Sequence, residues 1–195
     1  SNVGMVKIMQ NLKPIIHWNW FKKIGLDKRI ETDLFESTPG QIKSKEVFTS
    51  QPIHQAVASY GQGFSISPLK LVQLHAALAN GGYEVSPHVT FEFQRNNSYL
   101  KRNKFFSDDV SKVILNWMET VVQDGSGADV KINGYRIGGK TGTAQKAFNG
   151  TYSGIACSFV AILPIDKPKY LVFVLIDEPN KPYAYGSTVA VPVVK

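Results

Sequence analysis

Apolar residues recur at helical spacing near the start of the chain. From Val3 to Leu12 they fall every three or four positions, which predicts a helix that Pro14 closes. A second short helix is expected to end at Gly25, because glycine is favoured just beyond helix C-termini. Residues 27–58 are mixed and polar, with a proline and a glycine together in the middle, so an irregular loop region is expected there.

Two serines mark the start of longer helices. Ser67 precedes a proline and an apolar run over 69–79, the arrangement of an N-cap followed by a first-turn proline. Ser107 precedes a second run whose first turn is acidic, as the helix dipole favours. Between them, weak alternation over 89–93 predicts a short strand, followed by a polar hairpin or loop at 96–97. The apolar residues expected on one face of the helix after Ser107 are Val110, Val113, Ile114, Trp117, Met118 and Val121.

The last third of the chain changes to a strand-like pattern. Three strands are predicted, at 135–137, 155–163 and 170–176, and the last is so continuously apolar that it is expected to be central. The short turn at 164–168 favours antiparallel neighbours, and the residues after Gly186 are expected to begin a terminal helix. Helices followed by a meander of strands predict an α+β fold, with an antiparallel sheet flanked by helices.

Composition narrows the class of protein. The chain has 195 residues, of which 43% are hydrophobic and 19% charged, which suits one folded domain or most of one. No apolar run reaches the roughly 18 residues that a membrane helix needs. The chain opens abruptly, with neither a Met nor a signal peptide, so membrane anchoring is expected only through an upstream segment.

Charge and metal-binding residue types exclude further classes. Lys and Arg number 22 against 15 acidic residues, for a net charge of +7, yet the basic residues are scattered and no nucleic-acid binding is expected. The single cysteine, Cys157, lies in an apolar run and is predicted to be a buried core residue. The four histidines lack paired-ligand spacing, so neither a metal site nor a cofactor is expected.

One segment carries candidate chemistry, the run Gly-Gly-Lys-Thr-Gly-Thr at 138–143. Glycines in a strand usually indicate close approach of a ligand or another backbone, and an exposed edge strand can pair with an extended peptide. Thr141 and Thr143 alternate, so both hydroxyls are expected on one side, where they suit a carboxylate. Lys140 adds a cation, which can attract an anionic substrate or lower the pKa of a neighbouring hydroxyl. The alternative is a glycine-rich turn with an incidental lysine. A phosphate loop does not fit, because that motif needs a strand before its glycine-rich run and a helix directly after it, and neither is expected here.

Several further segments, in order along the chain, give the triplet Lys-Thr-Gly a context. They are Ser1–Met5 (SNVGM), Tyr60–Leu69 (YGQGFSISPL), Ala79–Gly82 (ANGG), Gly138–Gln145 (GGKTGTAQ), Ser158–Val160 (SFV), Ile176–Pro179 (IDEP) and Tyr185–Gly186 (YG). Lys-Thr-Gly with Ser-x-x-Lys and Ser-x-Asn is the signature of penicillin-binding proteins and class A β-lactamases. Over nearly its whole length, the chain resembles the class B penicillin-binding transpeptidases, which implies a β-lactamase-like transpeptidase fold that is incomplete at the N-terminus.

The resemblance implies roles for individual residues. Asn2 would be the Asn of Ser-x-Asn, an amide that hydrogen-bonds the substrate peptide, and Ser1 would fill the variable middle position. The backbone N–H of Thr143 would donate to the oxyanion, and both threonine hydroxyls would hold the substrate or β-lactam carboxylate. The residues that would line the cleft beside Asn2 are Lys140, Thr141, Gly142 and Thr143.

The nucleophile of the family lies in Ser-x-x-Lys, upstream of Ser-x-Asn. Ser67 and Lys70 have this spacing, but the family places Thr-Pro-Leu-Gln there, so Ser67 is interpreted as an N-cap. The resemblance therefore implies that residues 1–195 are the C-terminal portion of one transpeptidase domain, inactive alone, with its nucleophilic serine outside this chain.

The function implied by the resemblance is that of a serine D,D-transpeptidase. The complete protein would cross-link peptidoglycan stem peptides ending in D-Ala-D-Ala by acyl transfer and would be acylated by β-lactams. It would act in cell division or cell shape, beside other cell-wall synthesis proteins. Its place would be the periplasm, at the extracytoplasmic face of the bacterial inner membrane. The alternatives are a β-lactam sensor domain or a non-catalytic cell-wall synthesis scaffold with the same fold.

Overall fold

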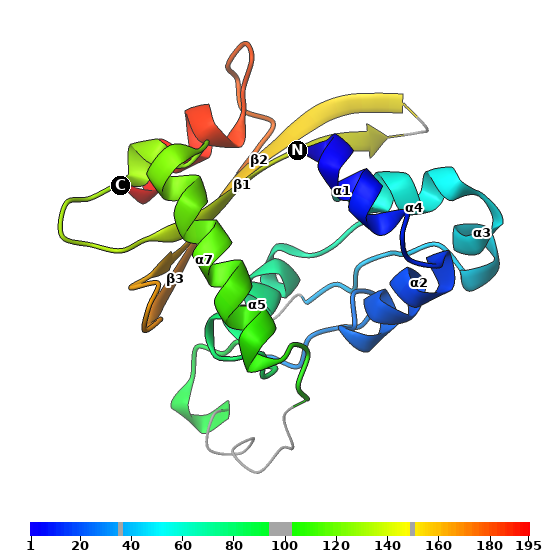
Figure 1. The fold of residues 1–195 in the computed structure, drawn as a ribbon, viewed down its shortest axis with the longest axis horizontal. Coiled ribbons are helices and arrows are strands. Elements are labelled where there is room, and N and C mark those ends of the chain that lie inside the picture. The colour runs from blue at the N-terminus through cyan, green and yellow to red at the C-terminus, as the bar shows by residue number, and fades with distance from the viewer. Residues whose placement is uncertain (35–36, 94–102, 149–150) are drawn as a thin grey trace. The chain divides into compact units, whose positions relative to one another are not determined.

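The computed structural model describes residues 1–34, 37–93, 103–148 and 151–195 (Figure 1). Contacts divide the chain into two compact units, and each is described by itself. Unit 1 consists of residues 1–74 and 85–105, and unit 2 of residues 75–84 and 106–195.

Unit 1 is helical. Its helices are α1 (Asn2–Met9), α2 (Pro14–Lys23), α3 (Lys45–Ser50), α4 (Pro52–Ala58) and the first part of α5 (Pro68–Ala79). Its core holds an aromatic cluster in which the Phe21 ring lies 5.9 Å from that of Phe48 and 5.1 Å from that of Phe64. The Gln55 amide donates to the Met9 and Leu12 carbonyls at 3.0 and 2.9 Å. This side chain therefore binds the carbonyl oxygen of the last residue of α1 and one in the segment that follows the helix.

The prediction of an irregular region over 27–58 was wrong for its second half, which forms α3 and α4. Both helices have local start signals: the Ser44 hydroxyl accepts a hydrogen bond from the Val47 N–H, and Pro52 occupies the first turn of α4. Each helix is too short to display an apolar repeat over two full turns, so periodicity alone misses it.

The strand predicted at 89–93 was also wrong. Residues 91–93 are helical, and the Asp33 carboxylate accepts hydrogen bonds from the backbone N–H groups of Val89 and Thr90 just before them. A distant carboxylate thus supplies acceptors near the start of a helical turn, which the local pattern could not reveal. The hairpin or loop expected at 96–97 lies outside the described residues.

Unit 2 contains an antiparallel sheet with the strand order β1 (Gly138–Phe148), β2 (Thr151–Leu163) and β3 (Tyr170–Asp177). The antiparallel α+β class and the turn at 164–168 are confirmed. However, the central strand of the described sheet is β2 rather than β3. The first strand also begins at Gly138 and not within 135–137, because the glycine-rich run is itself the strand.

Two hydrophobic clusters cover the two faces of this sheet. The helix α7 (Asp108–Asp124) contacts β1 and runs across the sheet in Figure 1. The cluster on one face includes Phe159 and Ala161 with residues of η2 (Gly186–Ala190) and α8 (Val191–Val194). The cluster on the other includes Val160 and Ile162 with residues of α7 and the end of α5. Successive residues of β2 therefore point to opposite, buried faces. Cys157 is fully buried, as predicted.

The start and cap of α7 are confirmed, since the Ser107 hydroxyl accepts from the Val110 N–H. The predicted apolar face was wrong in part: Val110, Val113 and Trp117 are exposed, with 47%, 46% and 63% of their surface accessible. Of the other predicted residues, Met118 is buried and Ile114 packs partly buried against the core. The buried residues of α7 are Ser111, Leu115, Met118 and Val122. A small serine within this stripe, at i, i+4, i+7 and i+11, hides it from a count of apolar residues.

The terminal helix predicted after Gly186 is present as η2 followed by α8. No helix in the described part of the chain is both long and apolar enough to cross a bilayer.

Candidate functional site

The first half of β1 carries the candidate site. In the described sheet β1 pairs only with β2, so its other side is an edge. Its first two glycines are required by packing: a Cβ at Gly138 would lie 2.4 Å from Ile165 Cδ1, and one at Gly139 would lie 2.4 Å from Phe159 Cζ. The close approach predicted from these glycines is therefore made by the chain's own core.

Lys140 presents a cation that is not neutralised. The residue is exposed, and its Nζ donates to the carbonyl oxygen of Thr141 at 2.8 Å. Among the described residues no carboxylate forms an ion pair with it. The surrounding protein nevertheless excludes enough water to lower the pKa of Lys140 below its usual value. The ammonium is thus available to an anionic ligand.

Each of the two threonine hydroxyls meets a partner from another segment of unit 2. The register pairs Thr141 with Phe159 and Thr143 with Cys157, so both threonines lie on the same face of β1, as the alternation predicted. The Thr141 Oγ1 lies 2.9 Å from the Ser126 Oγ. The Thr143 Oγ1 accepts a hydrogen bond of 3.1 Å from the Gly186 N–H.

The contact between Gly186 and β1 is very close. A Cβ at Gly186 would lie 2.6 Å from the Gly142 carbonyl oxygen and 2.5 Å from that of Ser158. A Cβ at Gly142 would lie 2.5 Å from the Ser158 Oγ. No side chain fits at either glycine without displacement, so the start of η2 rests directly on the backbone of β1.

The sequence missed two of these partners, Ser126 and Gly186, as parts of the site. Gly186 was predicted only to precede the last helix, and no role was predicted for Ser126. They lie 15 and 43 residues from the threonines that they contact, so no local spacing could have linked them.

Asn2 is the first residue of α1 in unit 1 and is exposed. The Ser1 hydroxyl caps this helix by accepting from the Gly4 N–H at 3.3 Å. The structure thus brings Lys140, Thr141, Gly142 and Thr143 together within unit 2, and it describes Asn2 separately in unit 1. A shared site of Asn2 with Lys140 stays a prediction.

Ser67 behaves as a helix cap. Its hydroxyl accepts a hydrogen bond of 3.2 Å from the backbone N–H of Lys70. The Lys70 ammonium is buried and donates to the Gln73 amide oxygen at 2.7 Å. This geometry supports the interpretation of Ser67 as an N-cap.

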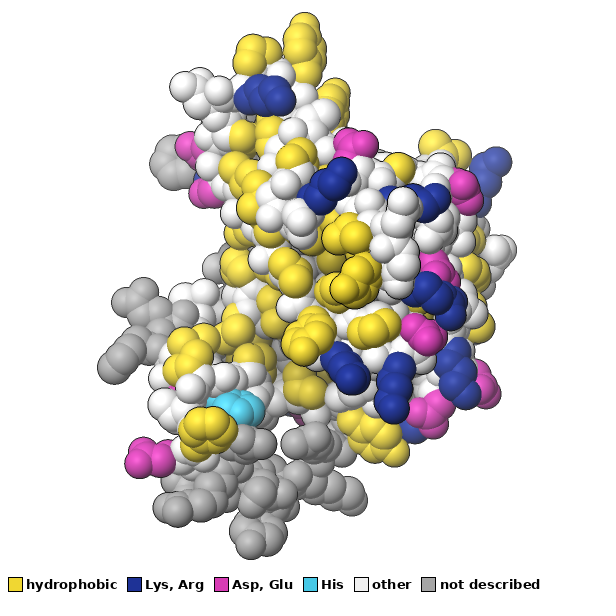
Figure 2. Space-filling model, turned by 90° about the vertical axis from the view of Figure 1, so that its left-hand side faces the viewer, with side chains coloured by type: hydrophobic (Ala, Val, Ile, Leu, Met, Phe, Trp, Pro, Cys, Tyr) yellow, Lys and Arg dark blue, Asp and Glu magenta, His cyan; other side chains and the backbone are white. Residues whose placement is uncertain are grey.

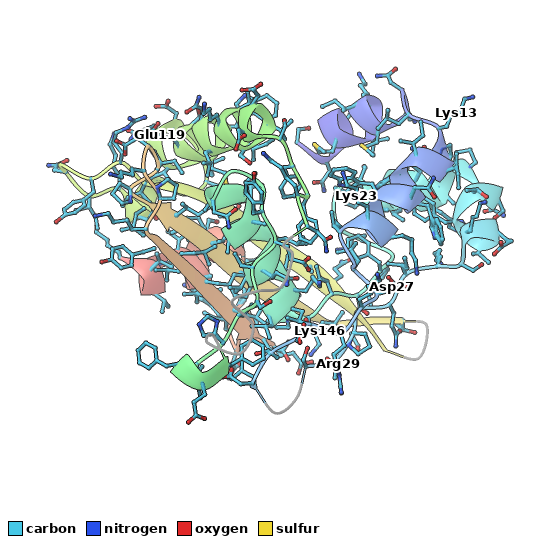
Figure 3. All side chains as sticks on the ribbon, turned by 90° about the horizontal axis from the view of Figure 1, so that it is seen from below. Lys13, Lys23, Asp27, Arg29, Glu119 and Lys146 are labelled. Atoms are coloured by element: carbon cyan, nitrogen blue, oxygen red, sulfur yellow. The ribbon has the colours of Figure 1, made fainter. Side chains whose placement is uncertain are left out.

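Two other basic residues of unit 2 form ion pairs with carboxylates. Lys146 in the second half of β1 contacts Asp177 at 2.9 Å and Glu178 at 2.8 Å. Arg136 binds Glu119 of α7 through two hydrogen bonds. Lys146 and Glu119 are labelled in Figure 3. On the face drawn in Figure 2, basic and acidic side chains are interspersed. Among the described residues, no group of three or more His, Cys, Asp or Glu side chains is placed to hold a metal ion.

The comparisons with known proteins agree on one family. The model of the penicillin-binding protein transpeptidase domain matches residues 1–195. A peptidoglycan D,D-transpeptidase FtsI homologue of Mesostigma viride is 41% identical over 219 aligned residues, which cover 100% of this chain and 37% of the relative. Stage V sporulation protein D of Bacillus subtilis is 32% identical over 203 residues, covering 99% of this chain and 31% of the relative.

Solved structures give the same result. The transpeptidase domain of Burkholderia pseudomallei penicillin-binding protein 3 superposes with a TM-score of 0.84 at 29% identity, covering 100% of this chain and 58% of that one. The aztreonam complex of Mycobacterium tuberculosis penicillin-binding protein 3 shares the fold, with a TM-score of 0.79 at 23% identity over 100% of this chain and 47% of that one. The chain belongs to the penicillin-binding protein transpeptidase family, as the sequence motifs predicted.

Proposed function

We propose that this chain is part of a serine D,D-transpeptidase, which cross-links peptidoglycan stem peptides by acyl transfer and is acylated by β-lactams. The chain spans 37% and 31% of the length of the two relatives described above, so the proposal concerns the complete protein of which the chain forms the C-terminal portion of one transpeptidase domain. One observation carries it: an edge strand presents an unneutralised Lys140 beside two oriented hydroxyls, in a chain that matches the family over its full length.

The roles of the residues follow from their chemistry. The stem peptide and a β-lactam both present a carboxylate, which Lys140 attracts and the hydroxyls of Thr141 and Thr143 bind. Gly142 lies on the edge strand β1, to which an extended peptide adds as a further strand. The Thr143 N–H donates to the oxyanion that forms when the serine attacks, and Asn2 binds the peptide amide. The nucleophilic serine and its lysine come from outside this chain.

The location and partners follow the same proposal. A transpeptidase acts where peptidoglycan is assembled, on the extracytoplasmic side of the inner membrane, with its anchor in a segment other than this one. The names of the relatives, FtsI homologue and Stage V sporulation protein D, support a role in cell division or a related wall synthesis, beside other proteins of that machinery.

Intact-mass spectrometry with a β-lactam tests the proposal. The complete protein is expected to gain the mass of one β-lactam, whereas residues 1–195 alone are expected to gain none. An adduct on the short chain would contradict the placement of the nucleophile outside it. The absence of an adduct on the complete protein would favour the alternative function, a non-catalytic cell-wall synthesis scaffold with the same fold. Turnover of a D-Ala-D-Lac thioester mimic separates a transpeptidase from a β-lactam sensor, which would be acylated without transferring the acyl group.

A further inference from the structure

The hydrogen bond between Gly186 and Thr143 fixes which partner donates. An amide N–H can only donate, so the Thr143 Oγ1 accepts this bond. The hydroxyl proton of Thr143 is then left over, and no acceptor among the described residues takes it. The hydroxyl proton of Thr143 is therefore available to a ligand beside β1.

The direction of the hydrogen bond made by the Thr141 hydroxyl also decides what Thr141 can offer to an anion. Its Oγ1 lies 2.9 Å from the Ser126 Oγ, and either hydroxyl can be the donor. If Thr141 donates to Ser126, it turns only lone pairs toward a carboxylate, which repel the anion. If Ser126 donates to Thr141, the proton of Thr141 is free for the anion, and the two bonds in series polarise and strengthen each other.

The backbone around Ser126 is held firmly. The N–H groups of Gly125 and Gly127 both donate to the Val121 carbonyl at 3.1 Å. A Cβ at Gly127 would lie 3.2 Å from the Phe159 ring, so the loop is pressed against the core beside the strand that pairs with Thr141. The Ser126 side chain thus reaches Thr141 from a fixed position.

We infer that Ser126 is a positioning residue for carboxylate recognition. It donates to Thr141, as the Gly186 N–H donates to Thr143, and both threonines thereby direct their hydroxyl protons to the same anion. This inference rests on the proposed function, since the anion is the carboxylate of the stem peptide or of a β-lactam. Ser126 itself does not touch the ligand.

The test compares two shape-matched variants of the complete protein, Ser126→Thr, which keeps the hydroxyl, and Ser126→Val, which replaces it by a methyl group. The second-order rate of acylation is measured with ampicillin and with its methyl ester, which lacks the carboxylate charge. Ser126→Val is expected to lower the acid-to-ester rate ratio about two- to tenfold, the range that one hydrogen bond supports. Ser126→Thr is expected to keep the ratio of the unaltered protein.

Ser107→Ala is the matched control, because it removes a serine hydroxyl at the other end of α7 that caps the helix. It is expected to lower the unfolding midpoint and leave the rate ratio unchanged. If Ser126→Val does not fold, Ser126→Ala gives the same comparison with a smaller side chain. An unchanged ratio in both hydroxyl-free variants, or an equal fall of both rates, overturns the inference alone. No acylation of the unaltered protein by either compound overturns the proposed function and this inference with it.

Discussion

The two halves of β1 place a lysine in opposite environments. In the first half, Lys140 has no carboxylate partner among the described residues, and burial lowers its pKa. In the second half, Lys146 donates to Glu178 and Asp177, and these hydrogen bonds raise its pKa. Glycines 138 and 139 are closely packed in the first half. In the second half, Gly154 lies opposite Lys146, and a Cβ there would meet only side-chain atoms of Glu178 and Lys146. One strand thus combines a lysine without a carboxylate partner among the described residues with a lysine paired to two carboxylates.

The largest expected difference between the halves is in catalysis. Lys140→Met in the complete protein is expected to lower the rate of acylation by a β-lactam about 10²–10³-fold, because it removes a charge that stabilises the reacting anion. Lys146→Met, which removes a lysine of the same strand, is expected to keep the rate within about twofold, because its ammonium serves the fold. Stopped-flow acylation measures both. Equal losses in the two variants would remove the distinction between the halves.

A smaller contrast is expected in stability. Gly139→Ala forces a methyl group to within 2.4 Å of Phe159 Cζ and 2.9 Å of the Val160 carbonyl oxygen. It is expected to lower the free energy of unfolding by about 1–3 kcal/mol. Gly154→Ala, on β2 opposite Lys146, meets only side-chain atoms of Glu178 and Lys146 at 3.0 Å or more, which can move aside. Its effect is expected to stay within about 0.5 kcal/mol.

Urea denaturation of the chain, followed by fluorescence, measures both glycine variants. A Gly154→Ala protein that is as unstable as Gly139→Ala would mean that the second half is packed as tightly as the first.

The smallest expected difference concerns proton binding. The pKa of Lys140 is lowered by burial, so its ammonium disfavours the fold, and stability rises with pH as the ammonium is lost just below the ordinary lysine pKa. The pKa of Lys146 is raised by its hydrogen bonds to the two carboxylates, so its contribution is present below the ordinary value and is lost as pH rises through the higher folded pKa.

NMR titration of lysines labelled by reductive methylation separates the two groups. The Lys140 resonance is expected to titrate at lower pH than that of an unfolded lysine, and the Lys146 resonance at higher pH. Assignment by Lys140→Met and Lys146→Met provides the control. Titration of both lysines at the same pH would contradict the environments described here.

Several helix ends could be predicted from residues that lie next to them in the sequence. The caps Ser67 and Ser107 and the glycine at 25 lie next to the helix ends that they define, so the sequence alone located those ends. Errors arose where a distant group decides the structure. Asp33 accepts the N–H groups before the helical residues 91–93, and packing against the sheet selects a face of α7 that includes Ser111.

The candidate site divides in the same way. The four residues from Lys140 to Thr143, with their alternating threonines, were predicted as site residues from the sequence alone. The sequence does not reveal the neighbours of its hydroxyls, because Ser126 and Gly186 lie 15 and 43 residues away and only the tertiary fold brings them to β1. The central position of β2 was not predicted, because the strand order depends on which strands pair with each other, and the pattern within one strand does not reveal its partners.

The contact of Gly186 with Gly142 and Ser158 gives the C-terminal segment an unexpected importance. The segment contacts Thr143 through its backbone, because the Gly186 N–H donates to the Thr143 Oγ1 and so sets the direction of that hydroxyl. Shortening the protein before Gly186 would erase that N–H, and a methyl group at this position would push two backbones apart. Changes in ligand preference can therefore originate in a segment that an inspection of side chains around the ligand would pass over.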